Sequence, residues 1–111
     1  MAKEYLEKLS RLIEELNLDD KIEQHLEVKH FFSGAALYID QTICASWSPV
    51  GLAFKLSDQE VKSLISNGKA RPLKYFPDGH IKQGYALFVN PCDYETSHWI
   101  IYFLKAAQQA Y

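Results

Sequence analysis

The stretch "HFFSGAALYIDQTICASW", residues 30–47, decides the fold, because it is nearly free of charge in a chain whose residues are 23% charged. Its apolar runs are short, and they are separated by Ser33-Gly34 and by Asp40-Gln41. Short runs rich in β-branched and aromatic residues, divided by turn-forming residues, are typical of β-strands. The stretch therefore predicts the central strands of a sheet, with a turn at Asp40-Gln41. Ser33-Gly34 is expected to mark a bend or bulge where a side chain would be in the way.

The strand pattern continues on both sides of this stretch and predicts an antiparallel meander. The expected strands are residues 28–32, 35–39, 42–47 and 52–56, with a turn at residues 48–51. In the last strand Leu52, Phe54 and Leu56 alternate with Ala53 and Lys55. One face of the sheet should therefore point to the core, and the other toward solvent or a partner.

Helices are expected before, within and after the strands. Apolar residues recur at helical spacing over residues 4–16, which predicts a helix with one buried side. Ser57 and Glu60 have the spacing of a capping box, in which each side chain bonds the other residue's free backbone N–H, and Asn67-Gly68 ends that helix. A final helix is expected to be capped by Asp93 and to bury Trp99, Ile100, Phe103, Leu104 and Ala107.

Between the second and third helices, residues 72–76 and 81–89 are predicted to form a hairpin around Pro77-Asp78-Gly79. The elements then follow the order α-β(3–4)-α-β(2)-α. This order predicts a two-layer α+β fold, an antiparallel sheet with helices on one face, formed by residues 1–111 as a single domain.

Composition limits the function classes. The 111 residues carry a net charge of −2 with a pI near 6.0, which gives no overall attraction to nucleic acid or anionic lipid. Cys44 and Cys92 lie far apart in apolar surroundings, which favours buried, reduced thiols over a disulfide. Neither a signal-peptide pattern nor an apolar run of membrane-spanning length is found in the sequence, so we expect a cytoplasmic protein without a membrane partner.

No pattern of reactive residues predicts catalysis. The four histidines have no recognised metal-ligand spacing, no serine lies in a G-x-S-x-G motif, and no Gly-rich phosphate-binding motif occurs. The carboxylates gather on the first helix and just after it, as expected of a solvated face. We therefore expect a protein that is not an enzyme and that has no catalytic residue, no metal site and no cofactor.

The charge changes sign along the chain. Residues 1–25 carry four Lys/Arg against seven Asp/Glu, a net of −3, whereas residues 55–82 carry six against three, a net of +3. The candidate binding surface of this basic part consists of Lys55, Lys69, Arg71, Lys74 and Lys82, interleaved with Tyr75 and Phe76. Such a pattern fits a track for single-stranded nucleic acid, although lysines at strand edges also serve to prevent sheet-to-sheet pairing. The basic part could equally meet the acidic first helix of a second copy, which would form a homodimer.

Several segments resemble the TfoX N-terminal domain family. Residues 31–40, "FFSGAALYID", are similar to its opening M-F-G-G-x-x-x-Φ-x-x-G motif, where Φ is apolar, and residues 70–73, "ARPL", are similar to its A-R-P-M motif. Residues 52–56 resemble its L-x-x-R/K-apolar strand, residues 79–85 its G-R-x-M-K-G-aromatic run, and Trp99 a frequent tryptophan of its last helix. Phe32, Gly34, Gly84 and Trp99 are the motif positions, while Ser33, Gln41 and Gln83 depart from the family pattern.

The resemblance implies a fold similar to type III secretion chaperones, in the free-standing single-domain form of this bacterial family. It also implies a role in competence or transcription regulation. Two functional hypotheses follow. The first is a non-enzymatic protein-interaction domain that uses the sheet face around Ala53 and Lys55 or the hairpin edge, as a monomer or homodimer. The second is a nucleic-acid-binding regulator that uses the basic hairpin over residues 69–82. The negative net charge favours the first.

Overall fold

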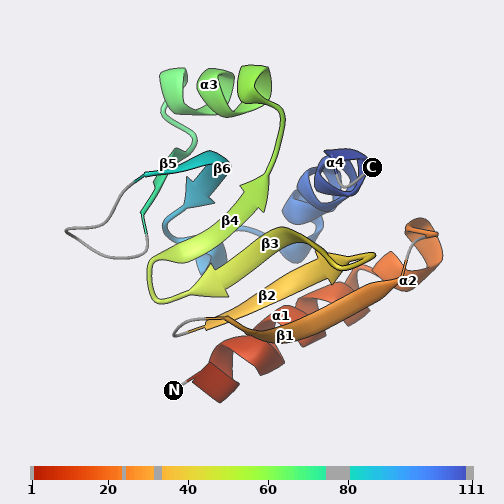
Figure 1. The fold of residues 1–111 in the computed structure, drawn as a ribbon. Helices are drawn as coiled ribbons and strands as arrows, with labels where there is room; N and C mark the ends of the chain where they lie inside the picture. The colour runs from red at the N-terminus through yellow and green to blue at the C-terminus, as the bar shows by residue number, and fades with distance from the viewer. Residues whose placement is uncertain (1, 24, 32–33, 75–80, 110–111) are drawn as a thin grey trace.

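The chain folds into helices and one antiparallel sheet, which confirms the predicted α+β class (Figure 1). The computed structural model describes residues 2–23, 25–31, 34–74 and 81–109, with the side chains of residues 2, 3, 82, 83, 92 and 109 excepted. Its elements are α1 (Ala2–Glu15), α2 (Leu18–Lys21), β1 (Leu26–Phe31), β2 (Gly34–Ile39), β3 (Thr42–Ser48), β4 (Gly51–Lys55), α3 (Asp58–Ser66), β5 (Arg71–Leu73), β6 (Lys82–Phe88), the 3₁₀ helices η1 (Pro91–Asp93) and η2 (Thr96–Trp99), and α4 (Ile100–Gln109).

The charge-poor stretch forms the centre of the sheet, as predicted. The strand order is β1-β2-β3-β4-β6-β5, and every neighbouring pair is antiparallel. Most side chains of β2 and β3 are buried on both faces of the sheet, as at Ala36, Leu37 and Ala45, so charge would be costly there. β5 and β6 form the predicted hairpin, while the predicted turn at residues 77–79 lies outside the described residues.

The two interruptions in the charge-poor stretch have different structural reasons. Asp40 and Gln41 have φ angles of 48° and 73°, so they form the predicted tight turn between β2 and β3 with both central residues left-handed. Asp40 is held there by its backbone N–H, which donates to the carbonyl of His25 at 3.0 Å, and by its side chain, which accepts from the backbone N–H of His25 at 3.1 Å. At Gly34 a Cβ would lie 2.7 Å from the Ser48 Cα, so only glycine fits, which confirms that a side chain would be in the way. The predicted bulge at this point was wrong, because Gly34 pairs regularly with Phe31 and the register of β2 shifts between Leu37 and Tyr38.

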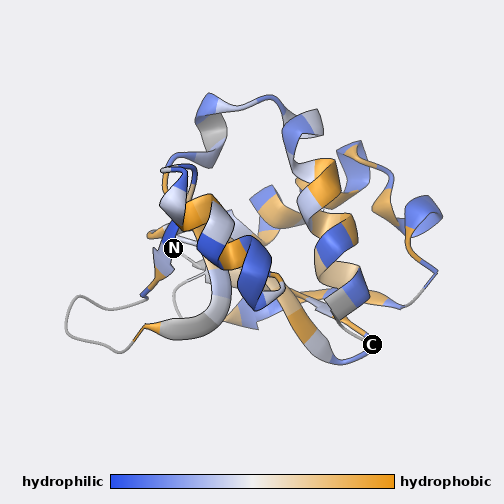
Figure 2. Ribbon diagram, turned by 90° about the horizontal axis from the view of Figure 1, so that it is seen from above, coloured by the Kyte–Doolittle hydropathy of each residue, from blue (hydrophilic) through white to orange (hydrophobic). Residues whose placement is uncertain are grey.

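The main core lies between the sheet and the helices. α1 packs on β1, β2 and β3, and α4 packs on β3 and β4, on the same face of the sheet. Viewed from above, hydrophobic and hydrophilic segments alternate along the helices, as expected when each buries one side (Figure 2). Phe54 lies at the centre of this core. Its ring centroid is 4.9 Å from that of Phe103, 5.9 Å from that of Trp99 and 5.6 Å from that of Tyr102.

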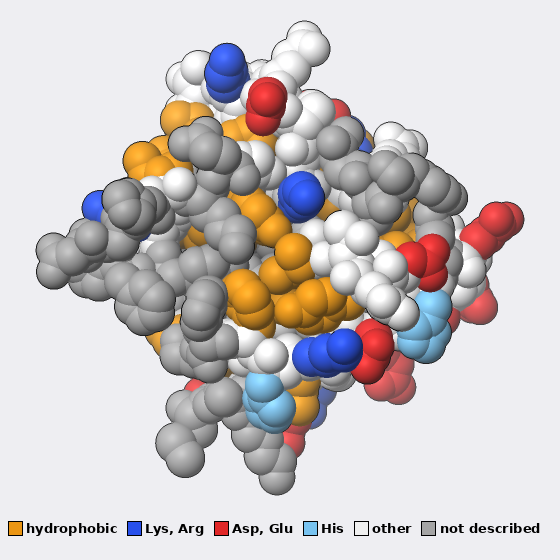
Figure 3. Space-filling model, in the orientation of Figure 1, with side chains coloured by type: hydrophobic (Ala, Val, Ile, Leu, Met, Phe, Trp, Pro, Cys, Tyr) orange, Lys and Arg blue, Asp and Glu red, His pale blue; other side chains and the backbone are white. Residues whose placement is uncertain are grey.

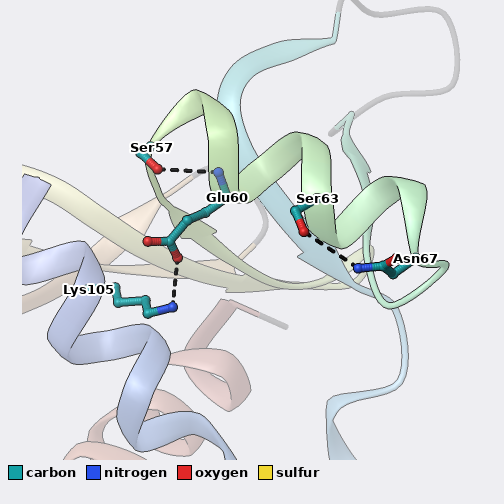
Figure 4. A network of polar contacts seen from close by, with 5 residues as sticks. All are labelled: Ser57, Glu60, Ser63, Asn67 and Lys105. Atoms are coloured by element: carbon teal, nitrogen blue, oxygen red, sulfur yellow. Dashed lines mark hydrogen bonds and ion pairs between the residues drawn. The ribbon is translucent and has the colours of Figure 1, made fainter.

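The predicted capping box of α3 is only half present. The backbone N–H of Glu60 donates to Ser57 Oγ at 3.3 Å, which is the expected cap. The Glu60 carboxylate instead pairs with the ammonium of Lys105 at 3.0 Å, so it connects α3 to α4 (Figure 4). The reciprocal half of the prediction was therefore wrong, because α4 offers Glu60 a charged partner that the local sequence does not show. Asn67-Gly68 ends α3 as predicted, with Gly68 at φ 72°.

The predicted start of the last helix was wrong. Asp93 belongs to η1, and α4 begins only at Ile100, after the second 3₁₀ helix. Pro91 fixes the backbone at the first position of η1, and the chain then turns twice before it enters the helix. Three residues of the predicted apolar stripe are nevertheless buried, with Trp99 2%, Phe103 0% and Ala107 6% exposed, whereas Ile100 and Leu104 are half-buried against the main core.

β6 contains a bulge at Gly84. Pro72 pairs with Ala86, whereas the next residue, Leu73, pairs with Lys82 and not with Tyr85, so the register shifts by three residues. Gly84 has φ 84° and open space around the position of a Cβ, so it is required for its conformation and not for close packing. Its carbonyl accepts a hydrogen bond from the Leu56 N–H at 3.0 Å.

Candidate interaction surface

The face of the sheet opposite α1 and α4 carries a second apolar cluster. Side chains alternate across a sheet, so Leu52 and Phe54 point to the main core while Ala53 points to the opposite face. Ala53, Leu73, Tyr85 and Leu87 form this cluster, with Ile43 and Val50 packed against it. We refer to these six residues as the open-face cluster. No helix of the described residues covers it, since the helical contacts are made to the main core.

The prediction of an exposed face around Ala53 needs a correction. Ala53 is 0% exposed, because its short side chain lies below its larger neighbours on the same face. The accessible members are Ile43 and Val50, which are half-buried. In the orientation of Figure 3, hydrophobic side chains gather at the centre of this face and charged side chains surround them. The alternation in the sequence thus predicted the direction of the side chain and not its burial.

Cations lie around the open-face cluster. Lys29 in the edge strand β1 has its ammonium 5.1 Å from the centroid of the Tyr38 ring and 3.7 Å from a carboxylate oxygen of Glu27. Lys55 is half-buried in β4, and Arg71 in β5 is paired with Leu87. Residues that pair directly across strands share a face, so Arg71 lies on the same side of the sheet as Leu87.

The five predicted basic residues do not lie together, because Lys55 belongs to β4 and the other four lie on or beside the β5–β6 pair. Lys55 pairs with Tyr85 and Arg71 pairs with Leu87, so the two cations flank β6 from opposite sides, two residues apart along that strand and on the same face of the sheet. Lys69 and Lys74 are exposed and lie on either side of β5, and Lys69 lines a hollow of 180 Å³ together with Arg71 and Asp93. Lys82 belongs to β6, but its side chain lies outside the described residues. The structure thus brings Lys69, Arg71 and Lys74 to one edge of the sheet.

The four motif positions also differ in their roles. Gly34 and Gly84 allow a close approach and a bulge respectively, and Trp99 is buried in the main core. Phe32 lies outside the described residues.

A groove on the helical side was not predicted from the sequence. It has a volume of 470 Å³ and lies between α1 and the chain from η1 to η2. Trp47, Pro91 and Trp99 contribute to its lining, and exposed glutamates of α1 lie along it. Sequence reasoning assigned those glutamates to a solvated face. Nothing in the local sequence shows that residues 91–99 return to α1, because the two segments are about eighty residues apart.

The reactive groups of the described residues are few. Cys44 is 1% exposed, and its thiol donates to the carbonyl oxygen of Thr42 at 3.3 Å. Burial raises the pKa of the Cys44 thiol to about 11, although a backbone hydrogen bond at Ile39 and the charge of Lys55 act in the opposite direction. This agrees with the predicted buried thiol, whereas the side chain of Cys92 lies outside the described residues.

Neither a metal centre nor a membrane span is found in the described part of the chain. Its His, Cys, Asp and Glu side chains form no group of three or more that could hold a metal ion. None of its helices combines the length and the apolar character that a membrane crossing requires. Comparison with protein-family models, with curated proteins and with solved structures gave no match. The resemblance to the TfoX N-terminal domain family, and the likeness to type III secretion chaperones that it implies, therefore rest on the quoted motifs.

Proposed function

We propose that the chain is a non-enzymatic, cytoplasmic interaction domain that acts in regulation, as the resemblance to TfoX-type competence and transcription regulators implies. The observation that carries this proposal is the open-face cluster, an apolar group on the sheet face opposite α1 and α4, of which Ile43 and Val50 reach the surface while the other four members are at most 6% exposed. In a two-layer domain, a solvent-facing sheet surface is normally polar. An apolar centre with a charged rim is typical of a surface that a protein partner covers.

The partner surface can be described from its complement. Apolar side chains of the partner would contact Ile43, near the start of β3, and Val50, in the turn between β3 and β4, since these are the half-buried members of the open-face cluster. Carboxylates would face Lys55 and Arg71, which lie on the same side of the sheet. Such charges set orientation and association rate more than affinity. The proposed partner is therefore a protein with an apolar patch bordered by Asp or Glu.

The experiment compares Ile43→Arg with Ile101→Arg. Ile101 is 53% exposed on α4, on the helical side of the molecule, so the second variant makes the same chemical change away from the proposed surface. Proteins from a native bacterial extract are captured on the unmodified chain and identified, and each candidate partner is purified and titrated calorimetrically against all three chains. Circular dichroism and thermal unfolding check that both variants fold.

The proposal predicts a purified partner that binds the unmodified chain and Ile101→Arg equally in a defined stoichiometry. Ile43→Arg should bind it at least about tenfold more weakly, because the substitution would bury a charge against the apolar part of the partner's surface. Equal binding of Ile43→Arg would show that the open-face cluster is not the interface.

A nucleic-acid-binding regulator is the second candidate, and the exposed cations at the β5 edge support it. Lys69, Arg71 and Lys74 are exposed, and none forms an ion pair with another described residue. Fluorescence anisotropy of labelled single- and double-stranded DNA across a salt series tests this function. The unmodified chain should bind more weakly as salt rises, and replacing the three cations by alanine should reduce the slope by about one for each lost phosphate contact. Absence of binding at low salt would contradict it.

A further inference from the structure

The groove beside α1 is elongated and has an apolar floor. Its hollow of 470 Å³ adjoins a second hollow of 210 Å³, and both are lined by Lys8, Trp47 and Pro91. Its α1 lining runs from Glu4 to Glu15, a rise of eleven residues, which corresponds to about 16 Å of helix. That length matches about five residues of extended peptide. The groove is thus long enough for a short segment of chain.

The groove already holds one cation against an aromatic surface. The ammonium of Lys8 lies 5.9 Å from the centroid of the Trp47 ring and 5.2 Å from that of Tyr5, and it pairs with Glu4 at 3.1 Å. Attraction between ammonium or guanidinium groups and aromatic rings is general, and it strengthens when water is excluded. Trp47 and Trp99, both of which line the groove, are the two tryptophans of the sequence.

The charged lining of the groove is acidic. Its carboxylates are Glu4, Glu7, Glu15 and Asp93, and its cations are Lys8 and Arg11, which gives four negative against two positive charges, a net of −2. Glu7 and Glu15 are exposed. An occupant with positive charges on either side of an apolar side chain would therefore complement both the rim and the floor.

We infer that this groove binds a peptide segment of a partner protein in which lysine or arginine flanks an apolar residue. The apolar residue packs against Trp47 and Pro91, and the flanking cations face Glu7 and Glu15. The groove shares none of its lining residues with the open-face cluster. The inference therefore extends the proposed interaction function to a second surface, and either surface can fail without the other.

The test uses the tryptophans of the groove as reporters. The full chain is titrated with an end-blocked peptide of alternating arginine and leucine, about six residues long, while tryptophan emission is recorded. A peptide with glutamate in place of arginine is the matched probe. We expect a saturable change in emission with the basic peptide, weakened by added salt, and none with the acidic peptide.

Two charge-reversal variants locate the binding. Glu7→Lys with Glu15→Lys changes the rim of the groove, and Glu14→Lys with Glu23→Lys makes the same change in net charge at exposed positions outside it. The first pair of substitutions should weaken binding of the basic peptide about tenfold, and the second pair should leave the affinity for this peptide within about twofold of that of the unmodified chain. Equal weakening by both pairs would overturn the inference, because it would reduce the effect to overall charge.

Three other results would overturn it as well. The first is an emission spectrum that does not change up to millimolar basic peptide. The second is an equal response to free arginine amide, which would indicate a site for small cations. The third is an emission spectrum that depends on protein concentration in the absence of peptide, which would indicate that a second copy of the chain fills the groove.

Discussion

Replacing Gly34 by alanine tests how closely β2 and β3 approach each other at the end of their hairpin. A Cβ at this position would lie 2.7 Å from the Ser48 Cα and 2.8 Å from the Ser48 Cβ, and it would contact the carbonyl oxygen of Trp47. Ordinary van der Waals contact begins at 3.4 Å, so the strands must separate by at least 3.4 − 2.7, or 0.7 Å, and by more at the Trp47 carbonyl oxygen, to accept it. The Trp47 carbonyl oxygen and the Ser48 Cα are backbone atoms of β3, which cannot move without weakening its hydrogen-bonded ladder.

We expect Gly34→Ala to lower the free energy of unfolding by about 2–3 kcal/mol, the upper range for overpacking in a well-packed interior. Urea unfolding followed by tryptophan emission measures it, and Trp47 lies beside the substitution. With a urea m-value of roughly 1–1.5 kcal/mol/M for a domain of this size, the midpoint should fall by about 2 M.

Gly68→Ala is the matched control. Gly68 has φ 72° and no atom within 4 Å of a Cβ, so alanine there meets only the cost of the left-handed conformation, about 1 kcal/mol. The reasoning is refuted if Gly34→Ala costs no more than Gly68→Ala, because the close approach would then contribute nothing.

Three further changes test the turn, the cap and the buried thiol. Gln41→Gly should raise the free energy of unfolding by about 1 kcal/mol in urea, since Gln41 has φ 73°, and an unchanged midpoint would contradict a strained turn. Ser57→Ala should lower the thermal midpoint through a loss of about 1 kcal/mol, and Ser57→Thr should recover most of it. At pH 8 a thiol with a pKa of about 11 is ionised about a hundredfold less than a thiol with a pKa of 9.0. In a Cys92→Ser background, iodoacetamide should therefore modify Cys44 at least a hundredfold more slowly in the folded chain than in the urea-unfolded chain. The thiol of the unfolded chain ionises first as pH rises, so Cys44 should progressively lower the free energy of unfolding between pH 9.0 and about 11. An iodoacetamide modification rate equal to that of the unfolded chain would contradict the burial of Cys44.

The sequence predicted the features that depend on neighbouring residues. The helical spacing of Leu9, Leu12 and Ile13 identified the buried side of α1, and all three are at most 7% exposed. The Ser57 cap and the Asp40-Gln41 turn are also local, since a few residues determine their backbone angles.

Features that depend on distant segments were predicted poorly. The carboxylate of Glu60 pairs with Lys105 of α4, a partner that the spacing around Ser57 cannot show. Asp93 has the chemistry of a helix cap, but Pro91 places it in a 3₁₀ helix before α4 begins. The groove beside α1 needs both Trp47 and Trp99, which come together only in three dimensions.

The bulge at Gly84 divides β6 into two parts that pair in different registers. Residues 85–88 hold the register with β4, and the shifted pairing with Leu73 begins only on the other side of Gly84. A change in the pairing of Leu73 with Lys82 is therefore absorbed at Gly84 before it reaches the pairing of β6 with β4. The alignment of the β5 edge can therefore change independently of the alignment of the central strands.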